Sequence, residues 1–180
     1  MGYVTVPDSA REVELIRWMR QYGGMISGLC AALLHDAALG QDVAQETFLR
    51  AYQKMDSFRG THQESEKAWL TKIAVNLCRD QWKSRWFRFV DRRVTPDMLP
   101  EPAVPLAVDD LDVYGAVMAL PEKEKQVILL RYYQDMNADE IAYALSMGRT
   151  SVYRHLEKAL KQLRQSLGEV TEPWMNTNGP

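Results

Sequence analysis

The sequence predicts an all-α fold with two small helical domains joined by a flexible acidic linker. Apolar residues recur along most of the 180-residue chain at the spacing of one helix face, and no stretch alternates with the period of two that is typical of a half-buried strand. One segment, residues 94–108, combines four prolines with acidic and small residues, a composition that cannot build a core. We therefore predict domains over 1–93 and 109–168, the linker over 94–108, and a disordered tail over 169–180.

The first predicted domain contains three helices. The first is expected to bend at Gly23-Gly24 and to end at a polar corner formed by His35-Asp36. A second helix follows over about 40–55, and a polar loop over 56–66 comes after it. The third helix begins near Glu66 and is strongly periodic. Its apolar stripe consists of Trp69, Leu70, Ile73, Leu77 and Trp82.

The second predicted domain ends in a helical hairpin. A helix over 109–118 is followed by a restart at Pro121, a residue favoured in the first helical turn. Two further helices, over about 138–145 and from Arg149 onward, are separated only by a sharp corner at Ser146–Gly148. Gly148 tolerates backbone angles that other residues avoid. This pattern favours a helix-turn-helix, and an ordinary amphipathic hairpin is the alternative.

The outer face of the last helix is basic. Between Arg149 and Arg164 five basic residues stand against one acidic residue, Glu157. Short polar and planar donors near the start of such a helix could meet base edges in a major groove, and cations further along could meet phosphates. The candidate DNA-binding residues are Arg149, Thr150, Ser151, Tyr153, Arg154, His155 and Lys158.

Two faces of the first domain are candidate binding surfaces. One helix face mixes acidic, amide and apolar side chains, which suits docking against a basic partner helix, and it consists of Asp42, Gln45, Glu46 and Leu49. The other surface combines a polar loop with a basic ridge at helical spacing, which suits phosphate contact beside unpaired bases. It consists of Phe58, Arg59, Gly60, Lys72, Asn76, Arg79 and Lys83. The alternative for both is a solvated helix surface.

Composition narrows the functional class. The net charge is only −2, but seven basic residues against two acidic ones over 72–93 precede five acidic residues and no basic one over 94–112. Cys30 and Cys78 lie within apolar helical patterns and are expected to be buried thiols. No export signal or membrane span is visible, which indicates a cytoplasmic protein. No catalytic constellation and no cluster with metal-ligand spacing occurs, so we expect no enzyme activity, no metal and no cofactor.

Four segments together resemble the sigma factors of bacterial RNA polymerase, the sigma-70 family. They are DVAQETFLRAYQ (42–53), DSFRG (56–60), AWLTKIAVNLCRD (68–80) and LPEKEKQVILLRYYQDMNADEIAYAL (120–145), and the helix-turn-helix follows them. The order and spacing are similar to the extracytoplasmic-function (ECF) group, in which region 2 and region 4 are joined without a middle domain. The resemblance spans about Leu15–Leu167.

The resemblance implies a transcription initiation factor and assigns roles to the candidate residues. The face from Asp42 to Leu49 would bind the clamp coiled coil of the largest core polymerase subunit. The loop from Phe58 to Lys67 and the ridge with Asn76 would recognise and melt the −10 element, and the last helix would read the −35 element. The implied partners are core RNA polymerase, including its flap, promoter DNA, and an anti-sigma factor.

The sequence departs from the family at four positions and in the length of one loop. Glu66 stands where many members carry an aromatic residue, and the loop before it is often shorter in the family. Ser146 replaces the usual turn glycine, Gly148 takes a position often held by a serine cap, and Glu157 stands where a histidine is common. The alternative function is a helix-turn-helix repressor or activator outside the polymerase holoenzyme. A recombinase with a helix-turn-helix tail and a helical interaction protein were further alternatives, but a recombinase needs a catalytic Ser or Tyr among arginines on a mixed sheet.

Overall fold

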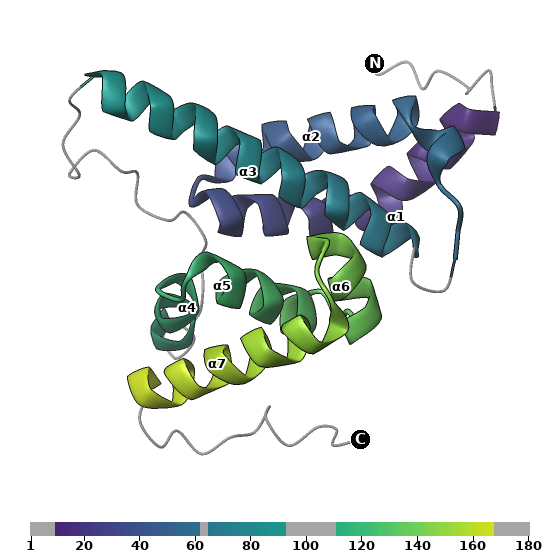
Figure 1. Ribbon diagram of the computed structural model, residues 1–180. Helices are drawn as coiled ribbons and strands as arrows, with labels where there is room; N and C mark the ends of the chain where they lie inside the picture. The colour runs from purple at the N-terminus through teal and green to yellow at the C-terminus, as the bar shows by residue number, and fades with distance from the viewer. Residues whose placement is uncertain (1–9, 62–64, 93–110, 168–180) are drawn as a thin grey trace.

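The computed structural model describes residues 10–61, 65–92 and 111–167. All regular elements in these ranges are helical (Figure 1). None of the described helices combines the length and apolar character needed to cross a bilayer. The expected linker (94–108) and tail (169–180) lie outside the described residues.

The first unit is built from α1 (Ala10–Leu34), α2 (Ala37–Gln53) and α3 (Glu66–Arg92), with a short 3₁₀ turn, η1 (Met55–Ser57), after α2. α1 is one continuous helix through Gly23 and Gly24. Trp18 on one side of the pair and Ile26 on the other are both buried in the same core. Glycine weakens a helix but does not by itself break one.

A close backbone approach joins α1 to α2. The corner contains His35 in the left-handed conformation, at φ 53°, and the Asp36 carboxylate caps α2 by accepting a hydrogen bond of 3.0 Å from the Leu39 amide. One turn later Gly40 presses against α1. A Cβ atom at this position would lie 2.5 Å from the backbone nitrogen of Ala31, which is closer than real Cβ contacts allow. Only glycine fits this crossing.

The second unit contains α4 (Leu111–Met118), α5 (Glu122–Ile128), a π-helical turn η4 (Leu129–Tyr133), α6 (Ala138–Leu145) and α7 (Arg149–Leu167). A capping box starts α6: Asn137 accepts from the amide of Glu140, and the Glu140 carboxylate accepts from the amide of Asn137. At the corner before α7 the left-handed residue is Ser146, at φ 52°, and not Gly148. The special backbone angle expected at Gly148 therefore belongs to Ser146, two residues earlier in the chain.

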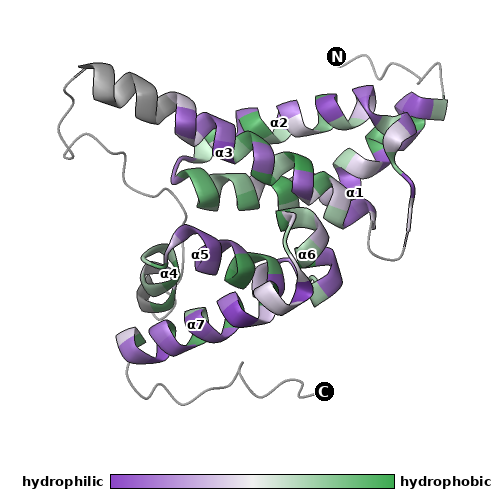
Figure 2. Ribbon diagram, viewed as in Figure 1, coloured by the Kyte–Doolittle hydropathy of each residue, from purple (hydrophilic) through white to green (hydrophobic). Residues whose placement is uncertain are grey.

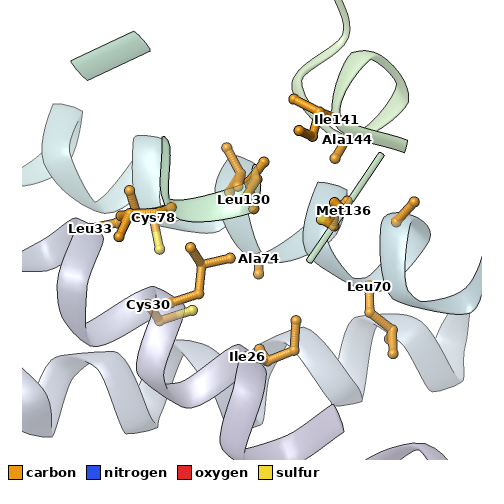
Figure 3. Close-up of a cluster of buried hydrophobic side chains, with 14 of the residues drawn as sticks. Ile26, Cys30, Leu33, Leu70, Ala74, Cys78, Leu130, Met136, Ile141 and Ala144 are labelled. Carbon is orange, nitrogen blue, oxygen red and sulfur yellow. The ribbon is translucent and has the colours of Figure 1, made fainter. Parts of the chain in front are cut away.

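The two units pack together through one continuous apolar core. Figure 3 shows this junction, where residues of α1 and α3 meet residues of η4, α6 and the turn between them. From the first unit come Ile26, Cys30, Leu33, Leu70, Ala74 and Cys78, and from the second come Leu130, Met136, Ile141 and Ala144. All ten are at most 2% exposed. As a result α6 lies between α3 and α7 (Figure 1).

Polar contacts frame the same junction. The Lys67 ammonium donates to the carbonyls of Gln134 (3.0 Å) and Asp135 (3.1 Å), so it satisfies the turn before α6. Ser65 Oγ donates to Glu140 Oε1 at 2.6 Å, and Gln134 Nε2 donates to the Met25 carbonyl at 3.3 Å. Buried backbone carbonyls at the ends of elements need such partners. The arrangement of the two units is therefore specific as well as apolar.

The two cysteines lie beside each other in this core, on α1 and α3 (Figure 3). The Cys78 thiol donates a hydrogen bond to Cys30, and this bond together with burial raises the pKa of Cys78. A thiol that stays protonated and buried is a poor nucleophile. The sequence placed both residues in apolar patterns but did not indicate that they are neighbours.

Gly40→Ala should destabilise the protein, because the added Cβ atom would push the backbones of α1 and α2 apart. Overpacking of this kind costs roughly 1–3 kcal/mol. Gly23→Ala is the matched control, since a Cβ atom there meets nothing within 4 Å. This control should be neutral or stabilising by up to about 1 kcal/mol. Chemical denaturation of both variants tests the prediction, and equal stability of the two would contradict it.

Candidate nucleic-acid and protein-binding faces

The outer face of α7 is polar and exposed. Its inner stripe, Val152, Ala159 and Leu163, is at most 1% exposed and packs toward α4 and α5. The helix is largely hydrophilic elsewhere (Figure 2). The exposed members of the predicted DNA-binding set are Arg149, Thr150, Tyr153, Arg154 and Lys158.

The first turn of α7 is organised by Arg149. Its guanidinium lies 3.3 Å from the Asp139 carboxylate of α6 and 5.8 Å from the centre of the Tyr153 ring. A hydrogen bond with the Tyr153 hydroxyl, and then the charge of Asp139, raise the pKa of Arg149. Tyr153 itself is 51% exposed. Two planar donor groups are thus presented side by side at the end of the helix that a major groove would receive.

His155 does not share this outer face. Its side chain is only 13% exposed, and Nδ1 lies 3.0 Å from Oε1 of Glu124 on α5. Burial raises the pKa of Glu124, but the hydrogen bond from His155 and further polar contacts outweigh burial and leave that pKa below its ordinary value. His155 therefore holds α7 against α5, and Ser151 is also partly buried. The sequence pattern had placed both residues on the polar outer face of this helix.

The predicted mixed face of α2 is exposed. Asp42 and Gln45 are exposed, and Leu49 is 51% exposed, an unusual state for a leucine beside charged residues. Glu46 is partly buried and pairs with Arg50 at 2.8 Å. The opposite side of α2 packs into the first unit, and the helix lies away from α5, α6 and α7 (Figure 1). This face is open for a partner.

An aromatic cluster supports the loop after α2. The Phe58 ring packs edge-on to Trp18, with centroids 6.0 Å apart, and lies 5.2 Å from the ring of Trp69. Trp69 is buried, as its apolar pattern predicted. Gly60 then takes the left-handed conformation at φ 60°, and Arg59 before it is exposed. The loop thus leaves the cluster through a turn that suits glycine.

The predicted ridge on α3 is split between a covered and an open part. Lys72 lies under α6, with its ammonium 4.2 Å from the centre of the Tyr143 ring. Asn76 is partly buried, and its Oδ1 accepts a hydrogen bond of 2.6 Å from Arg79. Arg79 and Lys83, further along α3, are exposed. The structure therefore brings the start of the ridge against the second unit and leaves its end free.

Sequence reasoning missed an ion-pair network that links α1 to the start of α3. The guanidinium of Arg17 binds the carboxylates of Glu14 and Glu66, and the Tyr22 hydroxyl donates to Glu66 Oε2 at 3.2 Å. Burial raises the pKa of Glu66, but the Arg17 hydrogen bond and other donors outweigh it and hold the pKa below its usual value. The sequence showed that Glu66 departs from the family. It did not show that Glu66 pairs with Arg17, about 50 residues earlier in the chain.

The described residues offer no group of three His, Cys, Asp or Glu side chains that could hold a metal ion. The features that remain are surfaces: the open α2 face, the loop and ridge around α3, and the outer side of α7. Their chemistry is that of recognition, with cations, amides and aromatic rings arranged on helices.

Comparisons with known proteins agree with this organisation. Residues 18–88 match the Sigma-70 region 2 family, and residues 116–165 match the family Sigma-70, region 4. The ECF RNA polymerase sigma factor SigL of Mycobacterium tuberculosis is 30% identical over 167 residues, covering 90% of this chain and 94% of that protein. SigW of Bacillus subtilis, also an ECF RNA polymerase sigma factor, is 29% identical over 161 residues, covering 79% of this chain and 85% of that protein.

Solved structures show a similar fold. The sigma factor RpoE from Bartonella quintana, crystallised with the anti-sigma factor NepR, superposes with a TM-score of 0.73 at 19% identity, covering 88% of this chain and 99% of that one. CnrH, solved in complex with the cytosolic domain of CnrY, superposes with a TM-score of 0.64 at 18% identity, covering 87% of this chain and 88% of that one.

Glu66→Gln should lower stability at neutral pH, because the amide cannot replace the charge that Arg17 binds. The loss should be on the order of 1 kcal/mol for such a partly exposed pair. The folded-state pKa of Glu66 is depressed, so its stabilising effect is present above the ordinary glutamate value of 4.5 and is lost as the pH falls below it.

Urea denaturation at pH 7 and at about pH 3.5 measures this difference. Glu157→Gln is the control, because Glu157 is exposed and forms no ion pair within 4 Å among the described residues. A difference between Glu66→Gln and the unchanged protein that stays constant across this pH range would sink the prediction.

Proposed function

Because the chain belongs to the sigma-70 family of RNA polymerase sigma factors, in its ECF group, it is a transcription initiation factor, and we propose that its exposed faces divide promoter recognition between the two helical units. The observation that carries the proposal is that each matched segment forms one unit with its own exposed binding face. The region 2 unit presents the α2 face and the α3 ridge. The region 4 unit presents the outer side of α7.

The α2 face binds core RNA polymerase in this proposal. Asp42, Gln45, Glu46 and Leu49 combine negative charge with an exposed apolar side chain, and such a mixed face fits a basic partner helix with an apolar seam. The clamp coiled coil of the largest subunit is the partner that the family implies. The position of α2, away from the second unit, supports this assignment. The α2 face and the second unit could then engage the polymerase at the same time.

The loop at Phe58–Gly60 and the α3 ridge open the −10 element. Lys72, Arg79 and Lys83 supply cations for the phosphates, and Asn76 supplies an amide that can read a base edge. Extruding a base costs a few kcal/mol, so a site that rewards only one base turns melting into sequence selection. The aromatic cluster beneath Phe58 supports the role because it holds the loop on a rigid base.

The outer side of α7 reads the −35 element. Arg149 and Tyr153 stand near its first turn, and Arg154 and Lys158 follow within reach of the phosphates on either side of a groove. His155 is left out of the base-reading set because it is bound to Glu124. We propose that it positions the helix.

The remaining roles follow from the family. Nucleotide polymerisation belongs to core polymerase, and we propose that this chain adds no catalytic group to it and works in the cytoplasm beside that enzyme. An anti-sigma factor is the proposed regulatory partner, as RpoE has in its solved complex with NepR. The match over residues 18–88 does not favour a helix-turn-helix regulator outside the holoenzyme.

Promoter-specific run-off transcription tests the proposed function. Purified chain is added to core polymerase with a library of promoter fragments that carry ECF-type −10 and −35 elements. Specific transcripts that appear only with the chain support the proposal. Duplex binding by the chain without any transcript from core polymerase would favour the regulator instead.

Replacing Asp42 and Gln45 together with alanine should abolish specific transcription, because the open α2 face would lose its charge and its amide. Each unit should stay folded, since both side chains are exposed. The affinity for core polymerase, measured by fluorescence anisotropy, should fall by at least about ten-fold. Gln53→Ala, an exposed change at the end of the same helix, is the control. Normal affinity of the double variant would refute the assignment of this face.

Asn76→Ala should impair promoter opening while leaving attachment to core polymerase intact. The loss of one amide that reads an extruded base should reduce the open fraction by about ten-fold, or about 1.4 kcal/mol, which lies within the range of roughly 1–3 kcal/mol for such a contact. Permanganate reactivity of unpaired thymines measures the opening. Arg154→Ala serves as the contrast, because it should weaken duplex binding at the −35 element first. Unchanged thymine reactivity would remove Asn76 from the melting role.

A further inference from the structure

A cavity of about 550 Å³ lies at the junction of the two units. Its volume is in the range that holds small-molecule ligands. Residues of both units form its wall, so the cavity exists only while they are packed together. The residues that define its chemistry are His35, Asn76, Arg79 and Trp82 from the first unit and Lys123 and Lys125 from the second.

The cavity wall carries an excess of positive charge. Three cationic side chains, Arg79, Lys123 and Lys125, face one carboxylate, Glu122. That carboxylate accepts a hydrogen bond of 2.8 Å from Gln126. Among the described residues no carboxylate lies within 4 Å of any of the three cations. The wall therefore has uncompensated positive charge in a recess, which is the electrostatic condition for holding an anion.

Lys125 is the most informative of these residues. It is only 6% exposed, and its ammonium lies 3.3 Å from Nε2 of His35 across the junction. Burial lowers the pKa of Lys125, and burial together with the charge of Lys125 lowers the pKa of His35. An ammonium group can only donate, so Nε2 of His35 is the acceptor in this contact. A buried lysine normally has an anionic partner at ion-pair distance, and among the described residues no carboxylate lies within 4 Å of the Lys125 ammonium.

The rest of the wall suits a phosphate group attached to a planar body. Arg79 offers a planar guanidinium, and Asn76 and Gln126 offer amides. Trp82 is 38% exposed, and its orientation is set by the hydrogen bond of 3.0 Å that Nε1 donates to the Leu33 carbonyl. An aromatic ring among cations and amides is a typical setting for nucleotide binding.

We propose that this cavity binds a small phosphate-bearing anion, recognised by Lys125 of the second unit and Arg79 of the first. A ligand that touches both units binds only when they are packed together, so it stabilises that arrangement. Asn76 and Arg79 also belong to the ridge assigned to promoter melting. The bound anion therefore keeps that part of the ridge away from DNA, a consequence that rests on the proposed function.

Isothermal titration calorimetry on the full chain, without polymerase and without divalent metal, tests the site. The probes are inorganic pyrophosphate, ATP and adenosine. We expect saturable binding of ATP or pyrophosphate and none of adenosine. Equal affinity for ATP and pyrophosphate identifies the phosphates as the ligand, and tighter binding of ATP adds the base. The proposal is overturned if neither phosphate probe binds at concentrations up to about 10 mM. A Kd above that value corresponds to a binding free energy of less than about 3 kcal/mol.

Lys125→Met should weaken binding by at least about ten-fold, because a charge-assisted contact is lost while the length of the side chain is kept. Lys54→Met is the matched control, since Lys54 is exposed at the end of α2 and lies outside the cavity wall. Arg79→Met is a second variant, and its exposed position on α3 does not threaten folding. Affinity that is unchanged in both cavity variants overturns the proposal.

Fluorescence energy transfer between dyes at the exposed positions of Gln53 and Gln162 reports whether the units are packed together. ATP or pyrophosphate should raise the packed fraction in the unchanged chain and not in Lys125→Met. An unchanged transfer efficiency despite saturating ligand would overturn the link to the arrangement of the units. Run-off transcription without added anion tests the proposed function separately. Failure of the anion site would therefore leave the proposed function standing, and failure of the proposed function would leave the anion site standing.

Discussion

The structure depends on one apolar contact, in which Leu130, Met136 and Ile141 of the second unit pack onto α1 and α3 of the first. These side chains are essentially inaccessible to water, and each contributes on the order of 2 kcal/mol when buried. The contact also sets where polar groups lie. Lys67 meets the carbonyls of the turn before α6 only because Met136 seats that turn against α3. The packed arrangement follows from this core.

The same contact sorts the binding faces into open and covered ones. The α2 face and the outer side of α7 remain open, whereas Lys72 is stacked under Tyr143 and Asn76 borders the cavity at the junction. Binding to duplex DNA through α7 is therefore compatible with the packed arrangement, but full use of the α3 ridge requires the units to separate. A chain organised in this way can hold its melting surface back until a partner favours the separated form.

Many local features were predictable because they depend on neighbours in sequence. The start of α3 at Glu66 and the burial of Trp69 follow from spacing and residue type. Predictions failed where contacts from another element decide. The left-handed residue at the corner before α7 is Ser146 and not Gly148.

The sequence by itself determined the helical class, the family and the polar faces of α2, α3 and α7, because periodicity and motif order are properties of the linear chain. Only the tertiary structure decided that His155 binds Glu124, that Arg17 binds Glu66 and that Lys125 meets His35. Helical periodicity states which side of a helix is buried, but not which other helix buries it. The covered ridge and the cationic cavity depend on which helices pack against each other, and only the tertiary structure shows this.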